Sequence, residues 1–167
     1  MDDSTQPVWP VDLDRVRLWP MESADGPLLQ ELLDDLADFR STFGEPGAAD
    51  AVSTFLALPE GHGYEDKLLL GLWRNGSLAG ALDCILGHPS ERSWTVGLLV
   101  VADRHRGVGI GSSVLDWLEV TAAQRGCSTV RGTVRAANRT GLAFAEGRGY
   151  TVGPADATGI HVATKRL

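Results

Sequence analysis

Residues 98–118, LLVVADRHRGVGIGSSVLDWL, decide the fold of this chain. The apolar residues at the start predict a buried strand, and the spacing of Val114, Leu115 and Leu118 predicts one face of a helix. Between the two lies a short segment in which a basic cluster is followed by glycines at alternate positions. The cluster is Arg104, His105 and Arg106, and the glycines are Gly107, Gly109 and Gly111.

A loop of this kind, between a strand and a helix, is suited to binding an anion. The first amide N–H groups of a helix have no carbonyl partner, and the helix dipole adds partial positive charge there. Glycine reaches positive φ easily and has no Cβ to keep a phosphate away from the backbone. We therefore expect a phosphate-bearing ligand at residues 106–112. The alternative interpretation is a glycine-rich turn that starts a helix and binds no ligand.

Two common phosphate loops do not match this segment. A P-loop needs a lysine before its Ser or Thr, and here Gly111 is followed by Ser112 and Ser113. A dinucleotide fingerprint needs a third glycine, but that position falls on Ser112 or on Val114, depending on which glycine starts the count. The loop therefore belongs to neither of these two classes of phosphate-binding loop.

The first third of the chain predicts a strand followed by two helices. Alternation predicts a strand over residues 15–20, closed by Pro20. Leucines and phenylalanines recur every three or four residues over 23–43, which predicts an amphipathic helix with Ser23 as its cap. A second, shorter helix is expected over 46–58, and a loop over 61–66.

The rest of the chain predicts strands, with one helix after the glycine loop and one near the end. Asn75-Gly76 is a strong hairpin signal between two strands, and Gly97 inside the next strand predicts a bulge. The complete order is β-α-α-β-β-β-α-β-α-β-β, an α/β fold with a mixed sheet and helices on its faces. The expected strands are 67–73, 77–86, 94–101, 128–135, 150–153 and 160–167, and the helices follow residues 109 and 138.

Length and composition indicate one globular domain. The chain has 167 residues, so we expect a loose N-terminal arm over 1–12 and a single domain over 13–167. Fifteen basic and 22 acidic residues give a net charge of −7, which disfavours nucleic acid as a partner and suits a cationic substrate. No run approaches the roughly 20 apolar residues of a membrane span. We expect a cytoplasmic protein.

The cysteines and histidines show no metal-binding or redox pattern. Cys84 and Cys127 lie far apart without CxxC spacing, so we expect buried thiols rather than acyl carriers. No set of cysteines and histidines has the spacing of metal ligands, and we expect no metal.

In its setting, Arg106-x-x-Gly109-x-Gly111 resembles the acyl-CoA signature of the GCN5-related N-acetyltransferase (GNAT) superfamily, [QR]-x-x-G-x-[GA]. A second segment over 138–150 is similar to the family pattern N-x-x-A-x-x-F-[YW]-x-x-x-G-[FY]. The resemblance covers about residues 13–166, and within the family it is to a bacterial subgroup of unassigned substrate. In the second segment Asn138, Phe144, Gly149 and Tyr150 match, whereas Gly141 and Ala145 depart.

The resemblance implies the GNAT acyl-CoA N-acyltransferase fold, whose two central strands splay apart to admit the pantetheine arm of acetyl-CoA. Leu99 and Val101 would bind the pantetheine amides, and Leu99 or Val100 would supply an N–H to the developing oxyanion. The implied binding loop is Arg106, Gly107, Val108, Gly109, Ile110, Gly111 and Ser112. Asn138 and Phe144 would line the other side of the arm, although Phe144 also fits an ordinary core position.

Transfer to an amine calls for a base, because an alkylammonium with a pKa of about 10.4 is almost wholly protonated at neutral pH. Asp83 is the best candidate, since a carboxylate among apolar strand residues needs a partner or a cleft. The alternative is a structural, hydrogen-bonded Asp83, with His88 and Glu91 as the next candidates. Many relatives carry a tyrosine acid where this chain has Ala145, and Tyr150 occupies a packing position.

The leading hypothesis is an N-acetyltransferase that moves the acetyl group of acetyl-CoA to a primary amine of a small molecule, by direct attack through a tetrahedral intermediate. One alternative is a non-catalytic acyl-CoA-binding sensor or partner module, which Ala145 favours. Another is an acetyltransferase acting on a protein N-terminus. A homodimer is left open.

Overall fold

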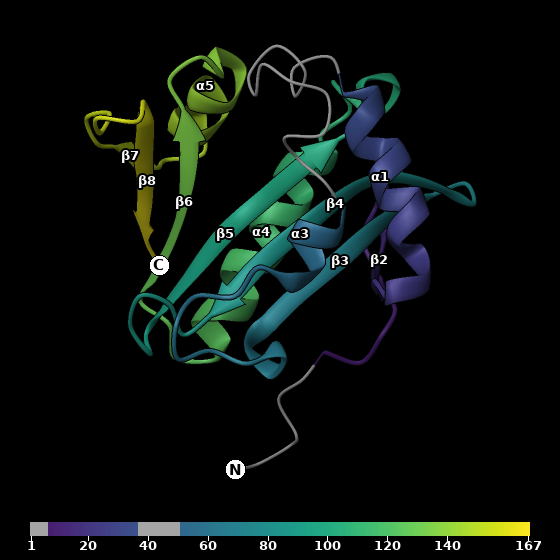
Figure 1. The fold of residues 1–167 in the computed structure, drawn as a ribbon, viewed down its shortest axis with the longest axis horizontal. Helices are drawn as coiled ribbons and strands as arrows, with labels where there is room; N and C mark the ends of the chain where they lie inside the picture. The colour runs from purple at the N-terminus through teal and green to yellow at the C-terminus, as the bar shows by residue number, and fades with distance from the viewer. Residues whose placement is uncertain (1–6, 37–50) are drawn as a thin grey trace.

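The computed structural model describes residues 7–36 and 51–167, and these form one mixed eight-stranded sheet (Figure 1). The strand order is β1-β2-β3-β4-β5-β6-β8-β7, antiparallel except for the β5–β6 pair. The strands are β1 Val11–Asp12, β2 Arg17–Pro20, β3 Lys67–Arg74, β4 Ser77–Leu86, β5 Ser93–Val101, β6 Thr129–Arg135, β7 Thr151–Val152 and β8 Ile160–Arg166. The α-helices are α1 Gly26–Asp35, α3 Ala51–Leu56, α4 Ile110–Gln124 and α5 Arg139–Gly147.

The helices cover the two faces of this sheet. In Figure 1, α1 and α3 lie in front of the central strands and α4 lies behind them. Strand residues alternate between the two layers, as the period of two requires. Leu82 and Cys84 pack in the cluster that contains the α4 leucines, whereas Leu69 and Ala81 pack with the α1 leucines. This confirms the predicted α/β class and its mixed sheet.

The β3–β4 hairpin turns at the predicted residues. Asn75 and Gly76 both have positive φ, 51° and 76°. Positive φ at both central residues gives the two-residue turn that matches the right-handed twist of the flanking strands. The hairpin lays β3 against β4 along nearly its whole length.

The central strands β5 and β6 pair only at their beginnings. Ser93–Val96 runs parallel to Thr129–Gly132, and beyond this point the two strands diverge (Figure 1). The divergence starts at Gly97. On the other edge of β5, Asp83 pairs with Leu98 and Cys84 with Val96, so Gly97 is an extra residue between them. The predicted bulge and the implied splay are both confirmed.

The N-terminal region differs from the prediction in three places. Val11–Asp12 of the expected arm pairs with β2 as a short edge strand. The helix expected over 23–43 starts with a 3-10 turn, Ser23–Asp25, and its cap is Glu22 rather than Ser23, because Glu22 N–H donates to Asp25 Oδ2 at 2.8 Å. The expected loop over 61–66 contains a second 3-10 turn, Tyr64–Asp66. Helix α1 ends at Asp35, because Leu36 is extended. Residues 37–43 of the expected first helix and residues 46–50 of the expected second helix lie outside the described residues.

Within residues 7–36 and 51–167, none of the helices has the length and apolar character needed to cross a membrane.

Candidate functional site

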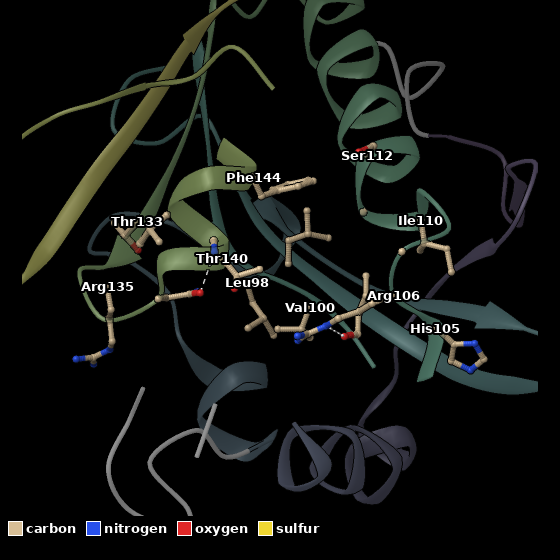
Figure 2. A pocket seen from close by; sticks show the side chains of 18 of the residues that line it. Leu98, Val100, His105, Arg106, Ile110, Ser112, Thr133, Arg135, Thr140 and Phe144 are labelled. Atoms are coloured by element: carbon tan, nitrogen blue, oxygen red, sulfur yellow. Dashed lines mark hydrogen bonds between the residues drawn. The ribbon is translucent and has the colours of Figure 1, made fainter. Parts of the chain in front are cut away.

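A cavity of about 580 Å³ occupies the gap between the diverging strands β5 and β6. Its walls come from the second half of β5, the glycine loop, the first turn of α4, the end of β6 and the first turn of α5. Figure 2 shows the side chains of Leu98 and Val100 on one side and those of Thr133, Thr140 and Phe144 on the other. The splay therefore creates an open groove in the middle of the sheet, and the glycine loop closes one end.

The glycine loop presents a row of unused backbone amides. Gly107 and Gly109 have positive φ, 77° and 85°, and Gly109 is the N-cap of α4. In the described part of the chain, no acceptor is found for the N–H groups of residues 107–112; the first amide after them, Ser113 N–H, donates to Gly109 O. A row of free N–H groups at a helix N-terminus is a strong site for an anion. The loop therefore has the free backbone donors that the expected phosphate site requires.

Arg106 has a different role from the one predicted for its backbone. Its N–H donates to Asp103 O at 3.2 Å, so the row of free amides begins at Gly107 and not at Arg106. Its side chain folds back over the cavity, where Nε donates to Val101 O at 2.9 Å and Nη1 lies 3.2 Å from Asp103 Oδ1 (Figure 2). The guanidinium thus links the end of β5 to the loop and adds positive charge beside the free amides.

The edge of β5 that faces the gap presents peptide groups at alternate residues, and of these the Val101 carbonyl is already used by Arg106 Nε. Ala102 N–H donates to Ala79 O at 2.7 Å, and this bond fixes the phase of the antiparallel β4–β5 ladder. Val100 and Leu98 therefore direct their peptide groups at β4, whereas Leu99 and Val101 direct theirs into the gap. Leu99 and Val100 were both expected to supply an N–H to an oxyanion. The Val100 N–H points at β4, so only the Leu99 N–H is available to a ligand in the gap.

A smaller cavity of about 150 Å³ continues the groove to the point where β5 and β6 meet. It shares Gly97, Leu98, Leu99 and Thr133 with the larger cavity, so the two form one channel. Small residues make up much of its floor, where Gly132, Ala145 and Ala163 leave room that larger side chains would fill.

A family model described as "Acetyltransferase (GNAT) family" matches residues 29–150, most of the chain. The chain belongs to the GNAT acetyltransferase family. Membership sets the reaction class, acyl transfer from coenzyme A to an amine nitrogen, and it confirms the resemblance deduced from the two motifs.

Solved structures of GNAT proteins share the fold at low sequence identity. An acetyltransferase from Thermus thermophilus is 22% identical, with a TM-score of 0.78 over 92% of this chain and 97% of that one. PaiA N-acetyltransferase from Thermoplasma acidophilum, in complex with coenzyme A, is 16% identical, with a TM-score of 0.68 over 91% and 99%. RimL, a ribosomal L7/L12 α-N-protein acetyltransferase in complex with coenzyme A, is 17% identical, with a TM-score of 0.73 over 93% and 96%. None of the curated proteins matches this chain.

The two motif residues expected on the far side of the GNAT groove lie there. Asn138 is the N-cap of α5, and its Oδ1 accepts from Gly141 N–H at 2.9 Å. Phe144 lies one turn further along α5, and its ring faces the start of α4: a Cβ built on Gly111 would stand 3.6 Å from its Cζ. Both residues line both cavities, so Phe144 is a wall residue as well as a packing residue.

One residue predicted to bind the cofactor lines neither cavity, and several residues that line the larger cavity were not predicted. Val108, inside the predicted loop, lines neither cavity and packs against the main core. The end of β6 contributes Thr133 and Arg135, and α5 contributes Thr140. Their only signal in the sequence is alternation along β6, which predicts a shared face but not that β5 leaves this face uncovered.

The side chain of Asp83 lies behind the bulge rather than in the groove. Its Oδ1 is 2.8 Å from Lys67 Nζ, and both side chains are almost completely buried, at 10% and 4% exposure. Burial raises the pKa of the Asp83 carboxyl, and the hydrogen bond and charge of Lys67 partly offset that rise. Asp83 lines neither cavity, but its carboxylate lies close to Gly97, a residue of both cavity walls.

A substitution at Gly97 tests this contact. A Cβ on Gly97 would stand 3.2 Å from Asp83 Oδ2, which is closer than ordinary packing permits. Gly97→Val is therefore expected to destabilise the fold by about 1–3 kcal/mol, a typical result of overpacking. Thermal unfolding measures the loss. The control is Gly147→Val, because Gly147 is exposed and a Cβ there has nothing within 4 Å. Equal melting temperatures for the two variants would contradict the contact.

The other candidate bases, His88 and Glu91, lie in the turn between β4 and β5, where His62 from the loop before β3 packs against His88. His62 and His88 form an edge-on ring pair with centroids 5.3 Å apart, and His62 Nε2 lies 3.1 Å from Gly87 O. Burial, followed by His62 and Arg131, lowers the pKa of His88. Neither histidine nor Glu91 lines the cavities, so this group does not face the groove.

Tyr150, the aromatic residue that ends the second motif, reaches the smaller cavity but is held by a polar cluster. Its hydroxyl donates to Glu119 Oε1 at 2.9 Å, and Lys165 Nζ lies 2.7 Å from Glu119 Oε2. Burial, and then the hydrogen bond to Glu119, raise the pKa of the phenol. Tyr150 is therefore a committed donor within the wall. Among the described residues, no cluster of three acidic, histidine or cysteine side chains is placed to hold a metal.

Proposed function

We propose that this GNAT protein transfers the acetyl group of acetyl-CoA to a primary amine of a small molecule, in the cytoplasm. The observation that carries the proposal is the row of unpaired amides from Gly107 to Ser112 at the mouth of an open groove. In the reaction the amine nitrogen bonds to the acetyl carbonyl carbon, and the carbon–sulfur bond breaks. CoA leaves as a thiolate, and the proton lost by the amine passes to a base or to water.

The groove suits acetyl-CoA along its whole length. The free amides of residues 107–112 and the nearby guanidinium of Arg106 would hold the diphosphate. The outward peptide group of Leu99 and the N–H of Val101 would pair with the pantetheine amides, as an added strand pairs with a sheet edge. Asn138 and Phe144 would enclose the arm from the α5 side. When bound, acetyl-CoA supplies an activated acyl group at the narrow end of the groove.

Leu99 is the proposed stabiliser of the oxyanion. Its N–H is directed into the gap at the point where the two cavities join. A fixed backbone donor in a site that excludes water favours charge on a carbonyl oxygen without the need to reorganise solvent. The donor is part of the main chain, so no side chain is needed for this role.

Asp83 is the proposed base for the amine proton, acting through a water molecule because its side chain lines neither cavity. Two observations support this role: its carboxylate lies against Gly97, a residue of both cavities, and burial raises its pKa toward the range in which a base works. The same carboxylate also holds the bulge through Gly97 and Lys67. The two roles are separated by a variant pair in the Discussion.

Ala145 favours one competing function, an acyl-CoA-binding module without catalysis. It lines the smaller cavity where many GNAT relatives carry a tyrosine acid, and the hydroxyl of Tyr150 is already used by Glu119. Loss of a general acid costs roughly 10²–10⁴-fold in rate. The departing thiolate has a pKa of about 8.5 by analogy with cysteine, so it leaves without a proton donor at a moderate rate.

A thiol-release assay distinguishes the functions. The protein is incubated with acetyl-CoA and a panel of polyamines, amino acids, aminoglycosides and short peptides with free N-termini. We expect release of CoA thiol with at least one small amine, at saturating acetyl-CoA. Binding of acetyl-CoA without thiol release across the panel would instead indicate a non-catalytic acyl-CoA-binding module. Thiol release with peptides alone would indicate that the acceptor is a protein N-terminus.

A further inference from the structure

Arg131 occupies the closed end of the groove, on β6 beside the last paired residues of the two central strands. It pairs with Thr95 of β5, and the next pair, Val96 with Gly132, is the last before the strands diverge. Arg131 lines the smaller cavity together with Gly97 and Leu99. A guanidinium is therefore part of the wall near the place where, under the proposed function, the acceptor amine meets the acetyl group.

Within residues 7–36 and 51–167, no carboxylate pairs with this guanidinium. In the part of the chain that the structure describes, the Arg131 side chain has no ion pair or hydrogen bond, and its Nε is buried without an acceptor. Three other cations with mostly buried side chains each have a carboxylate: Lys67 has Asp83, Lys165 has Glu119, and Arg148 has Asp116. A partly buried charge without a partner costs folding free energy, and a ligand of opposite charge that hydrogen-bonds to it removes that cost.

The neighbours of Arg131 on the sheet are hydroxyl side chains. Its partner on β5 is Thr95, and its partner on β8 is Thr164. Residues two apart on a strand share a face, which adds Thr129 and Thr133 to the same surface. The strand positions around Arg131 thus carry hydroxyl groups and no carboxylate, although the whole chain has a net charge of −7.

A guanidinium among hydroxyl groups is well suited to a carboxylate. Arginine binds a carboxylate with two parallel hydrogen bonds, and one guanidinium balances one carboxylate charge. Leu99 lies four residues beyond Thr95, the β5 partner of Arg131, which is about 13 Å along a strand at roughly 3.3 Å per residue. Arg131 and Leu99 line the same small cavity, so the long arginine side chain covers part of this distance and a short amino carboxylate can span the rest.

We propose that Arg131 binds a carboxylate of the acceptor and that the acceptor is therefore an amino acid or a closely similar amino carboxylate. The inference rests on the proposed N-acetyltransferase function and names the substrate class of the same site. It assigns Arg131 a specificity-determining role and no part in the handling of acetyl-CoA.

The test compares acids with their neutral analogues. The probes are the standard amino acids and β-alanine, their carboxamides, and 3-aminopropanol, each at saturating acetyl-CoA. We expect kcat/KM for the preferred acid to exceed that of its amide by at least about 10-fold, the scale of one charged hydrogen-bonded pair. Arg131→Gln should raise KM for the acid by about 10- to 100-fold and leave KM for acetyl-CoA unchanged, while Arg131→Lys should recover part of the loss.

Arg166→Gln is the matched control, because Arg166 is an exposed residue of the neighbouring strand β8 that lines neither cavity. Amides or plain amines accepted as well as the acids would overturn the inference and leave the acetyltransferase function standing. No turnover of any acid or neutral amine, despite acetyl-CoA binding measured by calorimetry, would overturn both. Equal effects of Arg131→Gln on acids and amides would also contradict a carboxylate contact.

Discussion

Gly111→Trp is expected to reduce the affinity for acetyl-CoA by at least about 100-fold, or ~2.7 kcal/mol, and to leave the fold intact. Gly111 lies in the first turn of α4, between the free amides and Phe144, and it lines the larger cavity. A Cβ there has only ordinary contacts, 3.6 Å from Phe144 and 3.9 Å from Val101. An indole on that Cβ would fill the groove where the diphosphate joins the pantetheine arm, without straining the backbone.

Calorimetric titration with acetyl-CoA measures this loss, and circular dichroism confirms that the variant is folded. Gly147→Trp is the control, because Gly147 lies in the last turn of α5, outside both cavities, and a Cβ added there would have nothing within 4 Å. An unchanged dissociation constant for Gly111→Trp would show that the ligand does not pass between α4 and Phe144.

The second large effect is expected at the buried pair of Lys67 and Asp83. Asp83→Ala leaves the Lys67 ammonium buried without a counter-charge, which costs about 3–5 kcal/mol of the free energy of unfolding. Replacing both charges, in Lys67→Met with Asp83→Leu, should recover most of that stability, because apolar residues of similar size often replace a buried ion pair without loss. Denaturant unfolding of the two variants and the wild type measures the difference.

The same variants test the role of Asp83 in catalysis. If Asp83 is the base, kcat falls by about 100-fold in Asp83→Asn and stays low in the double variant, although the latter is stable. A base works only when deprotonated, and burial raises the pKa of Asp83. Wild-type kcat should therefore decline as the pH falls, beginning above the range of an ordinary aspartate, and this limb should be absent in the variants. Full recovery of kcat in the double variant would make Asp83 a positioning residue only.

Local signals in the sequence predicted the parts of the fold that depend on local backbone conformation. The β3–β4 turn needs positive φ at two successive residues, and Asn75-Gly76 is a dipeptide that adopts it. Gly97 marks the extra residue of a bulge. Both features could therefore be predicted without knowledge of the strand pairing. Gly107 and Gly109 likewise predicted the free amides at the start of α4. In each case the residue type is itself the physical cause of the structure.

The parts of the site that depend on strand pairing could not be predicted in the same way. The choice of Leu99 rather than Val100 as the outward donor follows from the phase of the β4–β5 ladder, which no single residue reveals. The ion pair of Lys67 with Asp83 joins two strands whose register the sequence does not give. Arg131 becomes distinctive only when its strand partners, Thr95 and Thr164, are known to be hydroxyl residues rather than carboxylates.

The central claim is that the free amides of residues 107–112 hold the diphosphate of coenzyme A. The most direct test is a titration of ¹⁵N-labelled protein, followed by the amide resonances, with coenzyme A and separately with pantetheine, which lacks the diphosphate. We expect coenzyme A to shift the amides of residues 107–112 strongly, and pantetheine to shift those of Leu99 and Val101 while leaving 107–112 nearly unchanged. Large shifts elsewhere with coenzyme A, and none at 107–112, would contradict the claim.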